Sequence, residues 1–272
     1  MSGNWPKTLF LVAFGSLSVG ASAQEGPLRD EQPPIPVEEI IAQFAAKEAE
    51  FALARNNYVF RQNLTVQELD ARDRVLGEFR LVSDIGFEPD GVTRTETIVY
   101  APVSTLGISM TQEDYDDLEQ IQPFVLTTGS LPLYDLEYAG KQRVDEIDNY
   151  VFDVGPKVIE EGERYFEGRI WVDDLDLQIV KTYGKAVPDI REGGRENLFP
   201  RFETYRQPID GYWFPTYTRA LDTLDFSTGP VRIRQVVRYE DYRRFAVDVQ
   251  FRVEDEVDVA PEGPVPPTGD PR

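Results

Sequence analysis

The chain has 272 residues, of which 41% are hydrophobic and 12% aromatic, so it can fill the core of one large β domain or two modest ones. A formal charge of −21 speaks against nucleic acid as a partner and limits contact with an anionic membrane to a transient one. The sequence contains neither Cys nor His, which excludes disulfides, Cys-His and Ser-His nucleophile pairs and the commonest zinc ligand; no cofactor or metal is predicted.

The first 23 residues have the pattern of a secretory signal peptide. A polar start with Lys7 precedes an apolar run over residues 8–19, and the Ala-Ser-Ala of residues 21–23 supplies a small-x-small cleavage site. The alternative, a retained transmembrane helix, needs about 20 apolar residues, whereas this run is shorter and interrupted by Gly and Ser. We therefore predict export with cleavage after Ala23, which removes Lys7 and leaves a mature charge of −22.

The ends of the mature chain differ in composition from its middle. Residues 24–36 are polar and Pro-rich and are predicted to form a linker. Residues 254–272 are acidic and rich in Pro and Gly with few large apolar groups, and we expect them to be disordered. The folded domain is therefore predicted to span residues 37–253.

A first helix is predicted over residues 36–57. Ile40, Phe44 and Phe51 fall on one helical stripe, and the charged residues are expected on the opposite face. A proline at the start and paired asparagines at the end are typical helix limits.

Most of the remaining chain alternates apolar and polar residues with a period of two, which is typical of strands with one buried and one solvated face. Within residues 134–138, for example, the odd positions carry Asp and Glu and the even positions carry Tyr or Leu. The predicted strands are 58–69, 78–87, 91–102, 133–144, 149–156, 164–174, 177–184, 199–207, 212–226 and 231–253.

Two Asp-Gly pairs, at 90–91 and 210–211, predict tight hairpin turns. After the second pair, alternation places Trp213 on one face of the strand and its neighbouring rings on the other. Pro215 then indicates a sheet edge or a bulge.

A second, short helix is predicted within residues 111–123. Thr111 caps it, Asp114 follows three residues later as in a capping box, and Pro123 ends it.

The order of elements is one helix, three strands, a short helix and about seven strands. Short turns between strands predict a large antiparallel meander rather than parallel βαβ units, and the fold class is mainly β (α+β). Two helices are too few to cover a flat sheet, so we expect the sheet to curl into an incomplete β-barrel capped by the N-terminal helix and the short second helix. Such a curl often leaves room for an apolar ligand on its concave side.

Three segments resemble the periplasmic outer-membrane lipoprotein-sorting family of LolA-like and LolB-like carriers. They are YDLEYAGKQRVDEIDNYVFDVGPK (134–157), FEGRIWVDDLDLQIVKTYGK (166–185) and PIDGYWFPTYTRA (208–220). The resemblance covers roughly residues 36–253 and implies a periplasmic protein whose incomplete barrel holds the acyl chains of a lipid or lipoprotein without catalysis.

The binding hypothesis assigns the concave face to a ligand, although the same stripes of rings would also fill an ordinary core. The mechanism is passive, since an apolar cavity removes acyl chains from water and helix or loop movement releases them. The predicted cavity residues are Phe44, Tyr134, Leu136, Tyr138, Ile170, Val172, Phe245, Val247 and Val249.

The first alternative is a carboxylate-based enzyme such as a glycoside hydrolase, or a cation site, built on Asp173, Asp174 and Asp176. Adjacent acids in a strand point to opposite faces, so a solvated turn is the favoured interpretation.

The second alternative is an envelope sensor or interaction module of the same fold that binds a protein partner. It draws on a basic cluster in an acidic chain, in which Arg232, Arg234 and Arg238 share a strand face. Pairing of these arginines with neighbouring acidic strands is the simpler interpretation.

Overall fold

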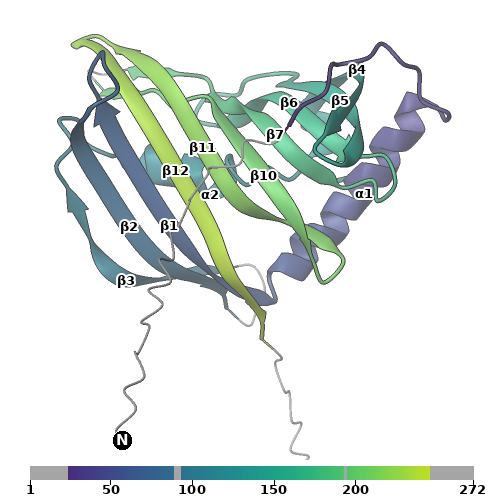
Figure 1. Cartoon of the computed structure of the whole chain (residues 1–272), viewed down its shortest axis with the longest axis horizontal. Coiled ribbons are helices and arrows are strands. Elements are labelled where there is room, and N and C mark those ends of the chain that lie inside the picture. The colour runs from purple at the N-terminus through teal and green to yellow at the C-terminus, as the bar shows by residue number, and fades with distance from the viewer. Residues whose placement is uncertain (1–23, 89–92, 193–194, 246–272) are drawn as a thin grey trace, which may run out of the picture.

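A ten-stranded antiparallel sheet forms the body of the computed structural model, which describes residues 24–88, 93–192 and 195–245 (Figure 1). The predicted fold class is therefore confirmed: the protein is mainly β, with a curled, open sheet and two α-helices. The strands of this sheet are β1 (Tyr58–Leu69), β2 (Val75–Phe87), β3 (Arg94–Ser104), β4 (Tyr134–Val144), β5 (Ile147–Pro156), β6 (Tyr165–Asp173), β7 (Ile179–Val187), β10 (Phe202–Ile209), β11 (Tyr212–Phe226) and β12 (Gly229–Arg244).

The strand order is β3-β2-β1-β12-β11-β10-β7-β6-β5-β4, which departs from the simple meander predicted. The first strand pairs with the last, so β1 and β12 lie side by side in the sheet. The chain passes from β3 at one edge to β4 at the other through α2 (Gln112–Gln120) and the short 3-10 helix η1 (Leu131–Leu133). A separate small hairpin, β8 (Ile190–Glu192) with β9 (Arg195–Asn197), was not predicted because three-residue strands are too short to show alternation.

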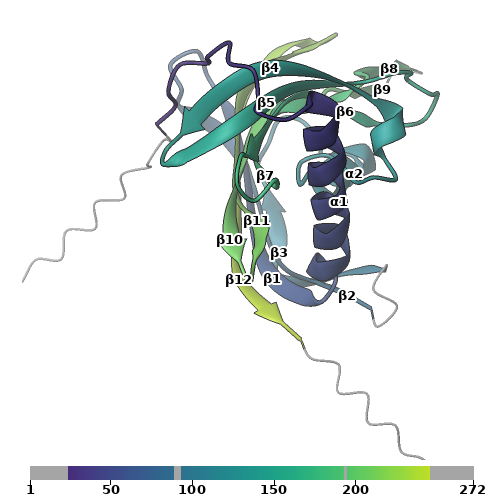
Figure 2. The same ribbon diagram turned by 90° about the vertical axis from the view of Figure 1, so that its right-hand side faces the viewer.

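Helix α1 (Val37–Arg55) lies against the concave side of the sheet, on the same side as α2, while β4 and β5 arch over one end of it (Figure 2). Ile40, Phe44 and Phe51 are buried as the helical stripe predicts. The expectation that all charged residues lie opposite is wrong, because Glu48 falls on the same stripe and is fully buried.

Strands β6 and β7 approach each other very closely at one pair of residues. Gly168 pairs with Gly184 at this point. A Cβ atom on Gly168 would lie 2.2 Å from the carbonyl oxygen of Tyr183 and 2.5 Å from the Cα of Gly184. The close approach of the two backbones therefore requires glycine here.

The hairpin between β10 and β11 follows the sequence closely. Asp210 and Gly211 both have positive φ angles, 51° and 86°, which suits a primed hairpin turn. Trp213 belongs to a small cluster on the outer face, whereas Phe214 packs against Phe51 on the concave side. The register shifts beside Pro215, so the predicted bulge is present.

The segment 24–36, predicted as a linker, runs along the free edge of β4. Glu25 bridges to Val144, and Arg29 bridges to Lys141 through backbone hydrogen bonds of 2.8 and 2.9 Å. This pairing covers an edge strand that would otherwise present unpaired N–H and C=O groups.

Several predictions fall outside the described residues: the signal peptide, the Asp90-Gly91 turn, the acidic tail, and the cavity residues Val247 and Val249. Within the described part of the chain, neither helix combines the length and apolar character needed to cross a bilayer.

Candidate functional site

Two cavities lie on the concave side of the sheet, and the side chain of Leu118 on α2 lines both. The first, which we call the α1 cavity, has a volume of about 500 Å³ and lies between α1, α2 and the strands β1 and β2. Its apolar walls are Phe51, Phe60, Ile85, Phe87, Leu118, Val125, Phe214, Tyr239 and Tyr242. Both its size and its aromatic lining are typical of small-molecule sites.

The second, which we call the loop cavity, has a volume of about 520 Å³. It lies under the segment that joins β3 to α2, next to the ends of β11 and β12. Its apolar walls are Val66, Leu106, Ile108, Met110, Leu118, Leu198, Phe199, Leu224, Phe226 and Ile233. The side-chain nitrogen of Gln235 is buried at this cavity and lacks a hydrogen-bond partner in the described structure.

Helix α2 lies between the two cavities and is anchored by polar side chains at several positions. Thr111 and Asp114 form the predicted capping box, and Asn197 donates to the Asp114 carboxylate at 2.8 Å. Asp117 is buried and accepts a hydrogen bond of 3.1 Å from Nε of Arg164.

The anchor of α2 predicts a pH dependence of stability. Burial raises the pKa of Asp117 to about 6, against the opposing effect of Arg164. A carboxyl with a raised folded-state pKa binds its proton more tightly when folded, so its contribution is present at low pH and is lost as pH rises through about 6.

Relative to Asp117→Asn, we therefore expect the native chain to gain about 1 kcal/mol of unfolding free energy between pH 7 and pH 5. Urea denaturation of both proteins at the two pH values measures this difference. A relative loss on acidification would show that the ion pair with Arg164 outweighs the burial of the carboxyl.

A buried cluster of charges lies where α1 meets β10. Nη1 of Arg206 donates to both carboxylate oxygens of Glu48, at 3.0 and 3.1 Å, and its Nη2 donates to the carbonyl oxygen of Phe124. Oε1 of Glu48 also accepts from the backbone N–H of Ile179 at 3.1 Å. Arg55 lies about two turns beyond Glu48 on α1 and lines the α1 cavity.

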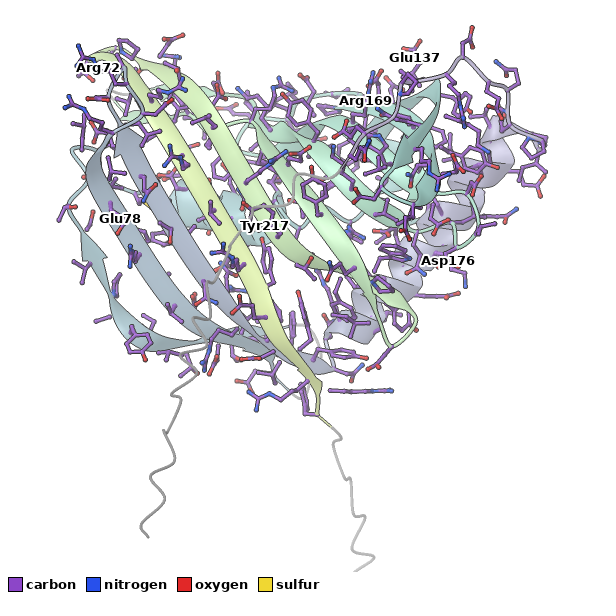
Figure 3. All side chains as sticks on the ribbon, viewed as in Figure 1. Arg72, Glu78, Glu137, Arg169, Asp176 and Tyr217 are labelled. Atoms are coloured by element: carbon purple, nitrogen blue, oxygen red, sulfur yellow. The ribbon has the colours of Figure 1, made fainter. Side chains whose placement is uncertain are left out.

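The outer face carries a larger groove of about 850 Å³ over β4 to β10, and about half of the side chains that line it are charged. Figure 3 shows Arg169 and Glu137 over the β4–β6 end and Tyr217 over the middle of this face. Arg169 pairs with Asp153 at 2.7 Å, and Lys181 pairs with Glu203 at 2.6 Å, but acidic side chains outnumber basic ones in the lining of the groove. The groove is therefore negatively charged, which disfavours an anionic ligand there.

The structure brings part of the predicted cavity set together beneath α1. Phe44 and Tyr138 both contact Phe152: their ring centroids lie 5.6 and 5.5 Å, respectively, from the centroid of the Phe152 ring. Tyr134, Ile170 and Val172 are buried in the same core, and Leu136 packs at its margin. Phe245 is the last described residue, where its N–H donates to Asn57. None of these side chains borders the α1 or loop cavity, and their role in ligand binding stays a prediction.

The residues of the alternative hypotheses have ordinary partners. Asp174 pairs with Lys141 at 2.8 Å, and Asp176 accepts a hydrogen bond from the indole of Trp213 at 3.3 Å. Arg232 pairs with Asp73 at 2.8 Å, as the simpler interpretation of the basic cluster expects. No group of three or more acidic side chains within the described ranges is arranged to hold a metal ion.

Sequence reasoning missed Glu48, Arg55 and Arg206. A signal for two of them was present, because positions 48 and 55 continue the spacing of Ile40, Phe44 and Phe51 on the helical stripe. Arg206 offered no such signal: it stands in a strand beside Pro208 and was indistinguishable from a solvated arginine.

No family model matches the chain, and no curated protein sequence matches it at a significant level. Among solved structures, it is similar to a DUF1329 family protein from Desulfovibrio piger, with 16% identity and a TM-score of 0.37, over 79% of this chain and 94% of that one. It is also similar to a domain described as outer-membrane lipoprotein-sorting from Vibrio parahaemolyticus, with 15% identity and a TM-score of 0.36, over 74% and 92%. A third similarity, to the MucA/MucB complex of Pseudomonas aeruginosa, has 12% identity and a TM-score of 0.22, over 74% and 100%. These similarities are distant, and the function of this chain rests on its own cavities and buried charges.

Proposed function

We propose that this protein is an exported, non-catalytic carrier that holds the acyl chains of a lipid or lipoprotein in its concave cavities. The observation that carries the proposal is the pair of apolar cavities, about 500 and 520 Å³, on either side of α2. Removing a methylene group from water into such a space contributes about 0.8 kcal/mol. A chain of many methylenes is therefore bound without any chemical step.

Binding rather than catalysis is supported by the residues at hand. The sequence has no His or Cys to act as a base or nucleophile. The walls of the loop cavity are mostly aliphatic and aromatic, and the buried nitrogen of Gln235 is a donor that a ligand carbonyl would satisfy. Movement of α2, which lines both cavities through Leu118, would open them for loading and release.

The direct test is extraction of lipid from the purified protein with organic solvent, followed by mass spectrometry, together with uptake of a fluorescent fatty acid by the stripped protein. We expect the solvent extract to contain lipid, or the stripped protein to take up the fluorescent fatty acid at one site or more. Absence of both would refute the carrier. Recovery of a stoichiometric envelope protein without any lipid would instead favour the interaction module.

A cavity-filling substitution tests whether the acyl chain binds in the loop cavity. Ile108 is half-buried at the loop cavity, so Ile108→Trp places an indole in that space. We expect acyl-chain affinity to fall about tenfold in titrations with a fluorescent fatty acid, since filled volume is lost to the ligand. Ile98→Trp is the matched control, because Ile98 is exposed on β3 and borders neither concave cavity. Equal affinity in the two variants would move the site away from the loop cavity.

A further inference from the structure

The ligand class can be narrowed from the charges at the α1 cavity, an inference that rests on the proposed function. Glu48 and Arg206 form a closed pair: each carboxylate oxygen of Glu48 accepts from Arg206, and one also accepts from Ile179. Both side chains are at most 1% exposed. Glu48 thus has its hydrogen-bonding capacity largely taken up by Arg206 and the backbone.

Arg55 brings a second positive charge to the same place. Its Nε is buried and donates to no acceptor in the described structure, and its charge is attracted by Glu48 at longer range than a direct ion pair. Burial lowers the pKa of Arg55, the charge of Arg206 lowers it further, and Glu48 opposes both effects. The cluster of Glu48, Arg206 and Arg55 therefore carries one positive charge in excess, and the half-buried Arg55 places that charge at the wall of the α1 cavity.

Arg55 lies in the wall of a cavity that could hold the missing partner. The α1 cavity joins this guanidinium to apolar side chains of two strands, among them Phe60 and Phe87. Arg94 and Glu119 also line the cavity but pair with each other at 2.6 Å, so the excess positive charge is that of Arg55. A planar guanidinium pairs best with a planar anion that accepts two hydrogen bonds, and one excess positive charge calls for one negative charge.

We infer that the ligand is a singly charged anionic amphiphile of the fatty-acid class, whose carboxylate pairs with Arg55 while its acyl chain lies in the α1 cavity. The long-range field of the chain opposes this ligand, because the net charge is −21. A preference for the acid over a neutral chain of equal length must therefore arise from a local positive group.

The test compares two probes that differ only in charge, cis-parinaric acid and its methyl ester, by fluorescence titration of the full chain stripped of copurified lipid. We expect the native protein to bind the acid about tenfold more tightly than the ester. In Arg55→Met the affinity for the acid should fall to that for the ester, while the affinity for the ester stays within about twofold of the native value. Lys47→Met is the control, since it removes one positive charge from the exposed side of the same helix and should behave as the native chain.

The outcomes separate the two proposals. If neither probe binds the native protein, the carrier function itself fails. If acid and ester bind equally well to the native protein, the carrier stands and the anionic ligand is refuted. If Arg55→Met folds and still prefers the acid, Arg55 is not its partner. Should Arg55→Met fail to fold, Arg55→Lys decides: a retained preference for the acid supports the charge of residue 55, and its complete loss contradicts it.

Discussion

Replacing Arg206 by Met is expected to lower the free energy of unfolding by about 3–5 kcal/mol, because it leaves the carboxylate of Glu48 buried without its partner. The carbonyl oxygen of Phe124 would lose its donor in the same variant. Burial already raises the pKa of Glu48. In Arg206→Met the carboxyl should take up a proton more readily, so the loss of stability should be smaller at pH 5 than at pH 7.

The control is the double variant Glu48→Met with Arg206→Met. It removes both buried charges together and should be more stable than Arg206→Met alone, although Ile179 and Phe124 lose hydrogen bonds. Urea denaturation followed by tryptophan fluorescence measures all three proteins. A loss below about 1 kcal/mol in the single variant would mean that Arg55 takes over the pairing with Glu48.

Gly168→Ala is expected to destabilise the protein by about 3 kcal/mol, since the added methyl group would collide with the backbone of β7 rather than with a flexible side chain. Relief requires β6 and β7 to separate at the Gly168–Gly184 pair.

Gly155→Ala provides the matched comparison. Gly155 lies in the neighbouring strand β5, and a Cβ there would meet nothing within 4 Å. Thermal and urea unfolding of the two variants should differ clearly, with Gly155→Ala close to the native protein. Equal stability of the two would show that β6 and β7 can move apart at the Gly168–Gly184 pair without cost.

Much of the fold could be predicted because period-two alternation and turn residues are local signals. The bounds of β1 and β11 coincide with the predicted 58–69 and 212–226, and the capping box of α2 was visible as Thr111 followed by Asp114. The pairing of β1 with β12 was not predictable in this way. Alternation tells which face of a strand is buried but not which strand lies next to it.

The candidate site was harder to predict for a related reason. A strand pattern marks the apolar face of every strand equally, so Ile170 in the solid core and Ile233 at a cavity wall look alike. Whether space remains beside a side chain depends on the bend of the sheet and the path of α2. Charged residues inside an apolar stripe, such as Glu48, were assigned to solvent on residue type alone.

The pairing of the first strand with the last has a consequence for how this protein is made. Tyr58 of β1 lies opposite Arg244 of β12. These two strands in the middle of the sheet can therefore pair only when almost the whole described chain has been synthesised. Contacts this distant in sequence form slowly, and a chain emerging from its N-terminus leaves β1 with one edge unpaired until β12 arrives. The sheet can therefore close only after β12 has been synthesised, which is compatible with the proposed export in an unfolded state.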